Sequence, residues 1–401
     1  MKKHWIWIII GVVVALIITL IILNRKSDSV ETPKGTNTTQ SPSTTISSAV
    51  QAGKLLSNNK CTGEGAGVLT QLPMKQSDYA MILPYGLMVG GHVTPIDHQY
   101  FSPTVFNSPR DTYPVYAMAD SVITDIQPRT NDRGTEYRFV FTMSCTFFYY
   151  YDLVTSLAPD IKAAYEKKNL NYKVKAGQLV GRIGGQTLDF AVWDTTKPLK
   201  NFINPSSYSG EAWKIYTADP LDYYSSEVKK NALAKYIRTI KPVSGRIDYD
   251  IDGKIIGNWF IKDSDGYTGT GENQNEYWGG HLAIAPEYID NSATIISFGS
   301  WNSGDAKQFA VKNPLDPAKI GVADGIVRYE IYGYYFVKKD GSRWDNMTHT
   351  FDPKLKISNQ EFGGCVLLQL IETRKLKVEQ FPKKKCTEKL VFTSASKIYT
   401  R

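Results

Sequence analysis

Several motifs that would give this sequence an immediate function are missing. The chain has four cysteines in 401 residues and no Cys-x-x-Cys pair, so a zinc site built from thiolates is not expected. No motif typical of nucleic-acid recognition occurs, which disfavours nucleic acid as a partner. The formal net charge of +8 does not lie in one run. This balance favours an anionic envelope polymer or lipid headgroups as partner, and ordinary solubility explains it equally well.

An uncharged apolar run occupies the N-terminus. Residues 5–23 would span roughly 28 Å as a helix, enough to cross a hydrocarbon core, and no small-x-small cleavage site follows them. The sequence therefore predicts a cytoplasmic tail at 1–4 and a transmembrane helix at 5–23 in contact with the lipid bilayer. Residues 24–55 are rich in Ser and Thr and predict a flexible linker. We expect a single-pass membrane protein with the bulk of the chain extracytoplasmic.

The four cysteines are even in number and widely spaced, which favours disulfides outside the cytoplasm. Three pairings are possible on paper. Cys365 and Cys386 flank a hairpin-like pair of strands, whereas Cys61 and Cys145 lie in the other half of the chain. The sequence therefore predicts the pairs Cys61–Cys145 and Cys365–Cys386.

Strand signals dominate the remaining chain. Residues 137–148 form a β-branched and aromatic run that predicts a strand, while the spacing of apolar residues predicts helices over 152–168 and 220–240. Residues 242–401 contain about seven strand-like runs separated by Gly and Asp-Gly turns, which predicts an antiparallel barrel or sandwich. We expect a mainly β protein with short helices.

Three stretches in the first half resemble the lysostaphin-type zinc metallopeptidases. They are PVYAMADSVIT at 114–124, VKAGQLVGRIGG at 174–185 and TLDFAVWD at 187–194, and HVTPIDH lies upstream at 92–98. The resemblance covers 84–194 and implies a twisted antiparallel β domain. In that family a His-x-x-x-Asp pair gives two zinc ligands, and a Tyr-x-His-Leu segment gives a catalytic histidine. A final His-x-His gives a second catalytic histidine and the third ligand.

Carried onto this chain, the resemblance implies a zinc site made of His92, Asp97 and Asp189. Asp97 lies five positions after His92 rather than four, so His98 is an alternative second ligand. Carboxylates and imidazoles are acceptable zinc ligands, and three of them plus a water are what zinc catalysis requires.

Both catalytic histidines of the family are replaced. Asp152 stands at the histidine position of Tyr-x-His-Leu, and Thr187 stands at the first histidine of His-x-His. The resemblance therefore implies a degenerate site, in which zinc is either absent or bound without efficient hydrolysis. If chemistry survives, Asp152 or His98 is the candidate base.

The second half is similar to lipocalin-like barrels in one motif, Gly-Asn-Trp at 257–259. Its aromatic residues are candidates either for lining a ligand cavity or for packing a core; they are Trp259, Trp278, Trp301, Tyr332 and Phe336. The expected domains are a degenerate peptidase-like domain at 56–200, a helical connector at 201–241 and a barrel or sandwich at 242–401.

Three functions follow from these patterns. The first is a non-catalytic extracytoplasmic protein that binds a cell-wall or surface polymer, or a partner, through its peptidase-like domain. The second is a zinc-dependent endopeptidase or amidase acting on the cell envelope. The third is a carrier of a small apolar ligand in the C-terminal barrel. Bound metal with an open cleft would favour the second, and a hollow barrel would favour the third.

Overall fold

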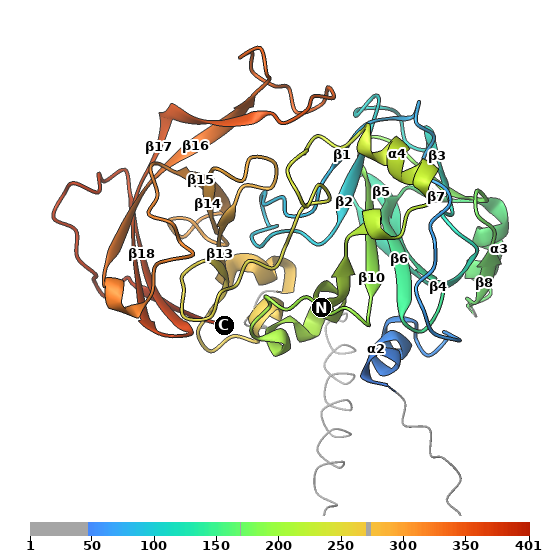
Figure 1. Ribbon diagram of the computed structural model, residues 1–401, viewed down its shortest axis with the longest axis horizontal. Coiled ribbons are helices and arrows are strands. Elements are labelled where there is room, and N and C mark those ends of the chain that lie inside the picture. Colours follow the sequence, from blue (N-terminus) through green and yellow to red (C-terminus); the bar gives the residue numbers. More distant parts are fainter. Residues whose placement is uncertain (1–46, 169, 270–273) are drawn as a thin grey trace, which may run out of the picture. The chain divides into compact units, whose positions relative to one another are not determined.

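Strands make up most of the regular structure in the computed structural model, which describes residues 47–168, 170–269 and 274–401. The chain from Ile46 to Arg401 forms one compact unit. The helices are short, which confirms the expected mainly β class (Figure 1). They are α2 (Ser48–Leu56), α3 (Pro159–Glu166), α4 (Ser226–Leu233) and the 3₁₀ helices η1 (Pro205–Tyr216), η2 (Pro220–Asp222), η3 (Gly266–Thr268), η4 (Gln274–Gly280) and η5 (Val322–Asp324).

The expected single-pass membrane localisation is corrected. Within the residues that the structure describes, no helix is long and apolar enough to cross a membrane. The longest α-helix there, α2, has nine residues, whereas a span needs about 20. The predicted helix at 5–23, the tail at 1–4 and the linker up to residue 46 lie outside the described residues.

The first β system contains eight strands in one sheet, seven of them in the order β1-β2-β10-β6-β5-β4-β8, with β11 on the far end of β10. A second sheet has the order β3-β9-β7. All pairings are antiparallel. The strands are β1 (Tyr79–Leu83), β2 (Gln99–Pro103), β3 (Tyr113–Tyr116), β4 (Ser121–Asn131), β5 (Gly134–Thr142), β6 (Phe147–Val154), β7 (Ser156–Leu157), β8 (Tyr172–Val174), β9 (Leu179–Ile183), β10 (Leu188–Asp194) and β11 (Thr217–Ala218).

Two sequence predictions in this system are wrong in detail. The run 137–148 is two strands, β5 and β6, with a break at 143–146. The predicted helix over 152–168 starts only at Pro159, because 152–154 complete β6 and Leu153 takes a positive φ of 65° that a helix excludes. Asp152 is therefore a strand residue, and this places it beside β10.

The predicted helix over 220–240 is also shorter than expected. Asp219 does cap the first turn, since its carboxylate accepts from the amide of Leu221. This turn is only the 3₁₀ helix η2, and α4 starts separately after the cap residue Ser225. Beyond α4 the chain is extended, and Tyr236 pairs with Ile82 of β1.

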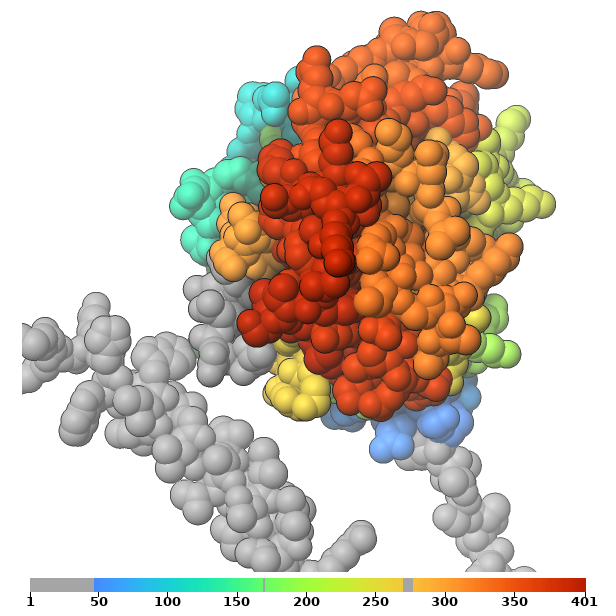
Figure 2. Space-filling model, turned by 90° about the vertical axis from the view of Figure 1, so that its left-hand side faces the viewer, coloured from blue at the N-terminus to red at the C-terminus, as the bar shows by residue number. Residues whose placement is uncertain are grey.

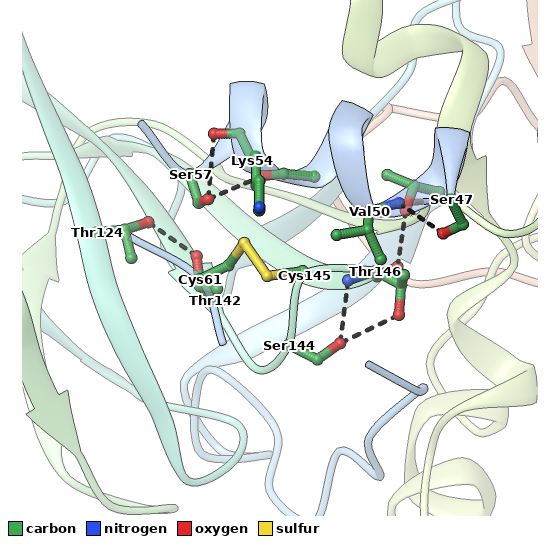
Figure 3. Close-up of a disulfide and its surroundings, with 12 residues drawn as sticks. Ser47, Val50, Lys54, Ser57, Cys61, Thr124, Thr142, Ser144, Cys145 and Thr146 are labelled. Atoms are coloured by element: carbon green, nitrogen blue, oxygen red, sulfur yellow. Dashed lines mark hydrogen bonds between the residues drawn. A yellow bond between two sulfur atoms is a disulfide. The ribbon is translucent and has the colours of Figure 1, made fainter. Parts of the chain in front are cut away.

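The predicted disulfide Cys61–Cys145 is confirmed and joins the segment after α2 to the β5–β6 turn (Figure 3). Helix α2 lies so close to this turn that a Cβ on Gly53 would be 1.7 Å from the carbonyl oxygen of Cys145. Ser57 ends the helix, and its hydroxyl donates to the carbonyl of Gly53. The N-terminal segment is thereby fixed against the sheet by both covalent and packing contacts.

The second β system is a ring of eight antiparallel strands. Each strand pairs with the next in the chain, and β19 returns to β12 through Phe260–Thr400 and Ile261–Tyr399. The strands are β12 (Gly257–Ile261), β13 (His281–Pro286), β14 (Thr294–Phe298), β15 (Lys307–Val311), β16 (Val327–Val337), β17 (Lys354–Glu372), β18 (Lys375–Pro382) and β19 (Lys397–Thr400). The disulfide Cys365–Cys386 is also confirmed.

Apolar side chains from alternate positions of this ring form one buried cluster. It includes Trp259, which is fully buried, with Leu282 and Phe298, and Trp301 packs against it. Burying each such side chain contributes about 1.5–3 kcal/mol. Trp259 therefore has the packing role rather than the ligand-lining role. Trp278 does not belong to this cluster.

Candidate functional site

The candidate site lies where β2, β6 and β10 run side by side. Asp189 of β10 is the register partner of Asp152 on β6 and of Tyr100 on β2. Asp97 and His98 directly precede β2, and both are buried. The antiparallel register thus brings together four of the five residues that the sequence singled out, although they are separated by up to 92 positions in the chain.

His92 is the exception. It lies on an exposed turn, where it exchanges backbone hydrogen bonds with Val89. Its ring centroid is 6.0 Å from that of His98. The residue therefore lies at the edge of the site rather than inside it.

A lysine that the sequence did not suggest occupies the centre. Lys214, from η1, is buried and forms an ion pair with Asp97 and another, at 3.0 Å, with Glu211. The other carboxylate oxygen of Asp97 accepts a hydrogen bond of 2.9 Å from the indole N–H of Trp213. Both oxygens of Asp97 are thus engaged by two consecutive residues of η1.

This pairing controls the charge of both groups. Burial alone would raise the pKa of Asp97, but the charge and hydrogen bond of Lys214 bring it to about 2. Burial alone would lower the pKa of Lys214, and the Asp97 carboxylate is the main cause that instead raises it well above its usual value. The two groups are therefore a permanently charged pair at neutral pH.

Asp152, the candidate base, is held by two arginines. Arg129 Nη2 donates to Asp152 Oδ1 at 2.9 Å, and Arg138 Nε donates to Oδ2 at 3.0 Å. The amide of Leu153 adds a hydrogen bond of 2.7 Å to Oδ1. Both carboxylate oxygens of Asp152 are thus occupied by cationic donors, and neither is free to contact a water or a substrate. The candidate role of Asp152 as catalytic base is therefore not supported.

His98 and Asp189 lie close together, with His98 Nδ1 3.5 Å from Asp189 Oδ2. Burial lowers the pKa of His98 well below its usual value. Burial and the neighbouring charge of Asp152 raise the pKa of Asp189 well above its usual value. Burial thus disfavours the charged form of both groups, and Thr187 donates a hydrogen bond of 3.2 Å to Asp189 Oδ1.

The residues do not fit a bound zinc ion. The described part of the chain contains no group of three or more His, Cys, Asp or Glu side chains placed to hold a metal. The proposed ligand set of His92, Asp97 and Asp189 is therefore not assembled into a metal site. The alternative set, in which His98 replaces Asp97, is not assembled either. The physical reason is that the ammonium group of Lys214 already neutralises Asp97, while burial disfavours the charged form of Asp189.

Sequence reasoning missed the basic partners of these carboxylates. Arg129 and Arg138 flank the β4–β5 turn, and the register pairs Gln127 with Arg138 and Arg129 with Glu136, so the two arginines are diagonal neighbours on one face. The positions of the two arginines on either side of this turn are a local pattern that could have indicated that they share a face. Lys214 gave no such signal, because it lies 117 positions from Asp97 in a segment without regular periodicity.

A cleft of about 540 Å³ opens beside this polar cluster. Its lining includes Gly90 and Gly91, which precede His92, together with Tyr277 and Trp278 of η4 and Gly299. Gly91 packs under the indole, where a Cβ would be 2.8 Å from a Trp278 ring carbon. Glycine there lets the backbone contact the flat face of the ring.

Aromatic rings connect the cleft to Lys214. The ammonium group lies 4.7 Å from the centroid of the Tyr267 ring, which is 5.5 Å from that of Tyr277. The Tyr277 and Trp278 centroids are 5.2 Å apart. The polar cluster and the cleft are therefore adjacent parts of one region.

Comparisons with known proteins give limited information. No family model and no curated protein matches this chain. Among solved structures, the crystal structure of a zinc-containing peptidase from Vibrio cholerae matches with 15% identity and a TM-score of 0.25. That match covers 33% of this chain and spans 38% of the peptidase. The solution structure of lysostaphin matches with 13% identity and a TM-score of 0.26, over 72% of this chain and 100% of lysostaphin. Both matches have a low identity and a low TM-score.

Proposed function

We propose that this protein is a non-catalytic binding protein of the cell envelope, in which the peptidase-like β system holds a strand of an envelope polymer. The observation that carries the proposal is the ion pair between Lys214 and Asp97. The ammonium group of Lys214 binds the carboxylate of Asp97, which the motifs assign as a metal ligand. Both oxygens of that carboxylate are thus bound by protein groups, Lys214 and Trp213, rather than left free for a metal.

The charges of the cluster support the same function. Asp97 and Glu211 pair with Lys214, and Asp152 pairs with Arg129 and Arg138. Hydrolysis of an amide needs an activated water or nucleophile and a group that moves a proton. A cluster whose carboxylates are already bound to cations is suited to holding a fixed shape, and that is what a recognition site requires.

The cleft gives the polymer a place to bind. Trp278 offers a flat apolar face, and the cleft beside it is also lined by serines, Ser300 and Ser303, whose hydroxyl groups can hydrogen-bond a ligand. A sugar ring or an extended peptide strand presents a flat face and polar edges, so it matches this lining. The two disulfides fit an oxidising, extracytoplasmic compartment, where such polymers occur.

The test is cosedimentation of the full-length protein with insoluble envelope polymer, purified with its peptide cross-bridges intact. The wild type should sediment, and Trp278→Ala should lower the affinity about tenfold because the indole face is lost. Tyr335→Ala is the matched control, since Tyr335 is a half-buried aromatic of β16 outside the cleft. Equal binding by wild type and Trp278→Ala would refute the cleft as the binding site.

A zinc-dependent endopeptidase or amidase is the competing function, and elemental analysis separates the two. We expect no stoichiometric zinc in the wild type, even after incubation with excess zinc and dialysis. Near-stoichiometric zinc that is lost in His92→Ala, together with zinc-dependent release of polymer fragments, would establish the enzyme instead. The same samples should show no cleavage if the proposal holds.

A further inference from the structure

The positive charge of the chain is concentrated in its last 29 residues. Residues 373–401 contain nine lysines and arginines and two glutamates, a net charge of +7, whereas the whole chain carries +8. The remaining 372 residues are therefore nearly neutral. Apolar strand residues lie between many of the lysines, so the positive charges do not form one run in the sequence. Their concentration is seen when the folded segment is considered as a whole.

This segment builds one outer face of the second β system. Leu376 and Val378 of β18 point into the buried core of the ring. Lys375 and Lys377 occupy the alternate positions of the strand and therefore point outward. After β18 the chain crosses the outside of the ring as a strap, residues 383–393. Figure 2 looks onto this side of the molecule, where the C-terminal segment in red forms a continuous band.

The strap is firmly attached to the strands beneath it. Cys386 is bonded to Cys365 of β17, and Leu390 is buried against Cys365 and Leu367. The buried carboxylate of Glu379 accepts hydrogen bonds from both the amide and the hydroxyl of Thr393. The lysines of the strap are therefore presented on a fixed backbone, which lowers the entropic cost of binding through them.

Most of these lysines lack a counter-charge. Within the described residues, none of Lys377, Lys383, Lys385 and Lys389 forms an ion pair, and the last three are exposed. Lys384 pairs with Glu388 at 3.5 Å. Like charges held close together on a rigid strap repel each other, and a polyanion would relieve that repulsion.

We propose that this face, made of β18 and the strap 383–393, is a docking surface for a phosphodiester polymer of the cell envelope. It is separate from the cleft proposed above and does not depend on it. The surface binds by charge density along an extended chain, with each lysine contacting phosphate oxygens of successive units.

Lysines supply the free positive charge of this face. A lysine ammonium is a compact point charge that binds phosphate oxygens from any direction. The arginines near this face are already engaged. Arg374 pairs with Asp252, Arg401 is buried, and Arg328 donates to the carbonyl of Leu390.

Two other polyanionic partners are less well matched. A bilayer is bound best when apolar side chains can insert, and in the described residues of this segment the only exposed large hydrophobic is Val391. Phe392 is turned inward under Lys377, whose ammonium group lies 4.6 Å from the ring centroid. Nucleic acid does not fit the oxidising compartment that the disulfides indicate.

The experiment compares two lysine-to-glutamine triples in the full-length protein. The test triple changes Lys383, Lys384 and Lys385, and the control triple changes Lys162, Lys167 and Lys168 at α3. All six lysines are exposed. Each triple contains one lysine paired with a glutamate four positions on and one with positive φ, namely Lys383 at 62° and Lys168 at 57°. The two variants therefore lose the same charge in similar backbone settings.

Affinity for poly(glycerol phosphate) is measured by titration calorimetry at several salt concentrations. The wild type should bind, and the test triple should bind at least about tenfold more weakly, with a salt dependence reduced by about 2–3 units of slope. The control triple and Trp278→Ala should bind within about twofold of the wild type. If the test triple misfolds, Lys377→Gln with Lys389→Gln replaces it and should weaken binding by about fivefold.

Several results would overturn the proposal. They are no binding of poly(glycerol phosphate) by the wild type, an equal loss in the control triple, equal or tighter binding of polygalacturonate, or stronger binding to phosphatidylglycerol vesicles or to single-stranded DNA. Because the cleft is tested with an insoluble cross-linked polymer and this face with a soluble phosphodiester, either proposal can fail without the other.

Discussion

Asp97 in the first β system and Glu287 in the second are both buried carboxyl groups, but they have opposite electrostatic settings. Asp97 faces the ammonium group of Lys214, and its pKa is lowered to about 2. Glu287 accepts hydrogen bonds of 2.7 and 2.6 Å from the amides of Ile289 and Asp290, and burial raises its pKa to about 7. Amide donors alone do not offset burial, whereas a cation in contact does.

The difference extends to the two regions as wholes. The interior of the strand ring is an apolar cluster around Trp259, while the space between β2, β6 and β10 holds ions arranged in pairs. Buried ion pairs contribute little net stability compared with apolar packing. The first region therefore retains a costly arrangement that folding alone does not require, and this is consistent with a recognition role there.

The largest expected effect tests whether Lys214 alone sets the state of Asp97. Lys214→Met should lower the free energy of unfolding by about 3–5 kcal/mol at neutral pH, because it leaves a buried carboxylate without its cation. The loss should shrink as the pH falls, since the pKa of Asp97 will then be raised like that of Glu287 and protonation removes the charge. Urea denaturation at pH 5 and pH 8 measures both.

Two further variants serve as controls for this result. Lys175 forms a pair with Asp120 at 2.7 Å, but both side chains are exposed, so Lys175→Met should change stability far less. The double variant Asp97→Asn with Lys214→Met should recover part of the loss, because no charge remains buried. An equal loss in the buried and the exposed variant would contradict the role assigned to Lys214.

A smaller effect is expected from Glu287, and it concerns pH dependence. The folded-state pKa of about 7 lies above the ordinary 4.5, so the folded state holds a proton that the unfolded state releases between these values. This contribution is fully present below pH 4.5 and is lost as the pH rises through 7, by about 3 kcal/mol.

Glu287→Gln keeps an acceptor oxygen for the two amides but cannot ionise. Its unfolding free energy should therefore fall less between pH 5 and pH 8 than that of the wild type. The comparison uses the difference between the two proteins, so contributions that both share cancel. Parallel pH profiles for variant and wild type would show that Glu287 does not carry a raised pKa.

The sequence predicted the parts of this comparison that depend on local pattern. Cysteine spacing predicted both disulfides. The motifs linked Asp97, His98 and Asp189, and the pairing of β2 with β10 places these residues near one another. The helix expected over 152–168 failed because strand pairing with β10 outweighs helical spacing.

The sequence could not supply the charges that decide the chemistry of the site. Lys214 reaches Asp97 through η1, an irregular segment whose position depends on tertiary packing. The expected connector at 201–241 thus contributes the central residue of the site. A buried cation leaves no periodic pattern in the sequence. A chain can therefore match a motif at the metal-ligand positions and still bind those side chains with a cation of its own.

The smallest effect concerns Asp189, a third buried carboxyl group, whose neighbours are His98 and the hydroxyl of Thr187. Burial raises its pKa well above the ordinary value, which favours the neutral acid. Thr187→Val removes one hydrogen bond of 3.2 Å to a neutral oxygen, so the unfolding free energy should fall by about 1 kcal/mol. Thr187→Ser, which keeps the hydroxyl, is the control. A loss of about 2–3 kcal/mol in the valine variant alone would be the signature of a bond to an ionised carboxylate. Asp189 would then be charged beside His98, with the negative charge that a metal ligand needs, and burial would not have raised its pKa as it does that of Glu287.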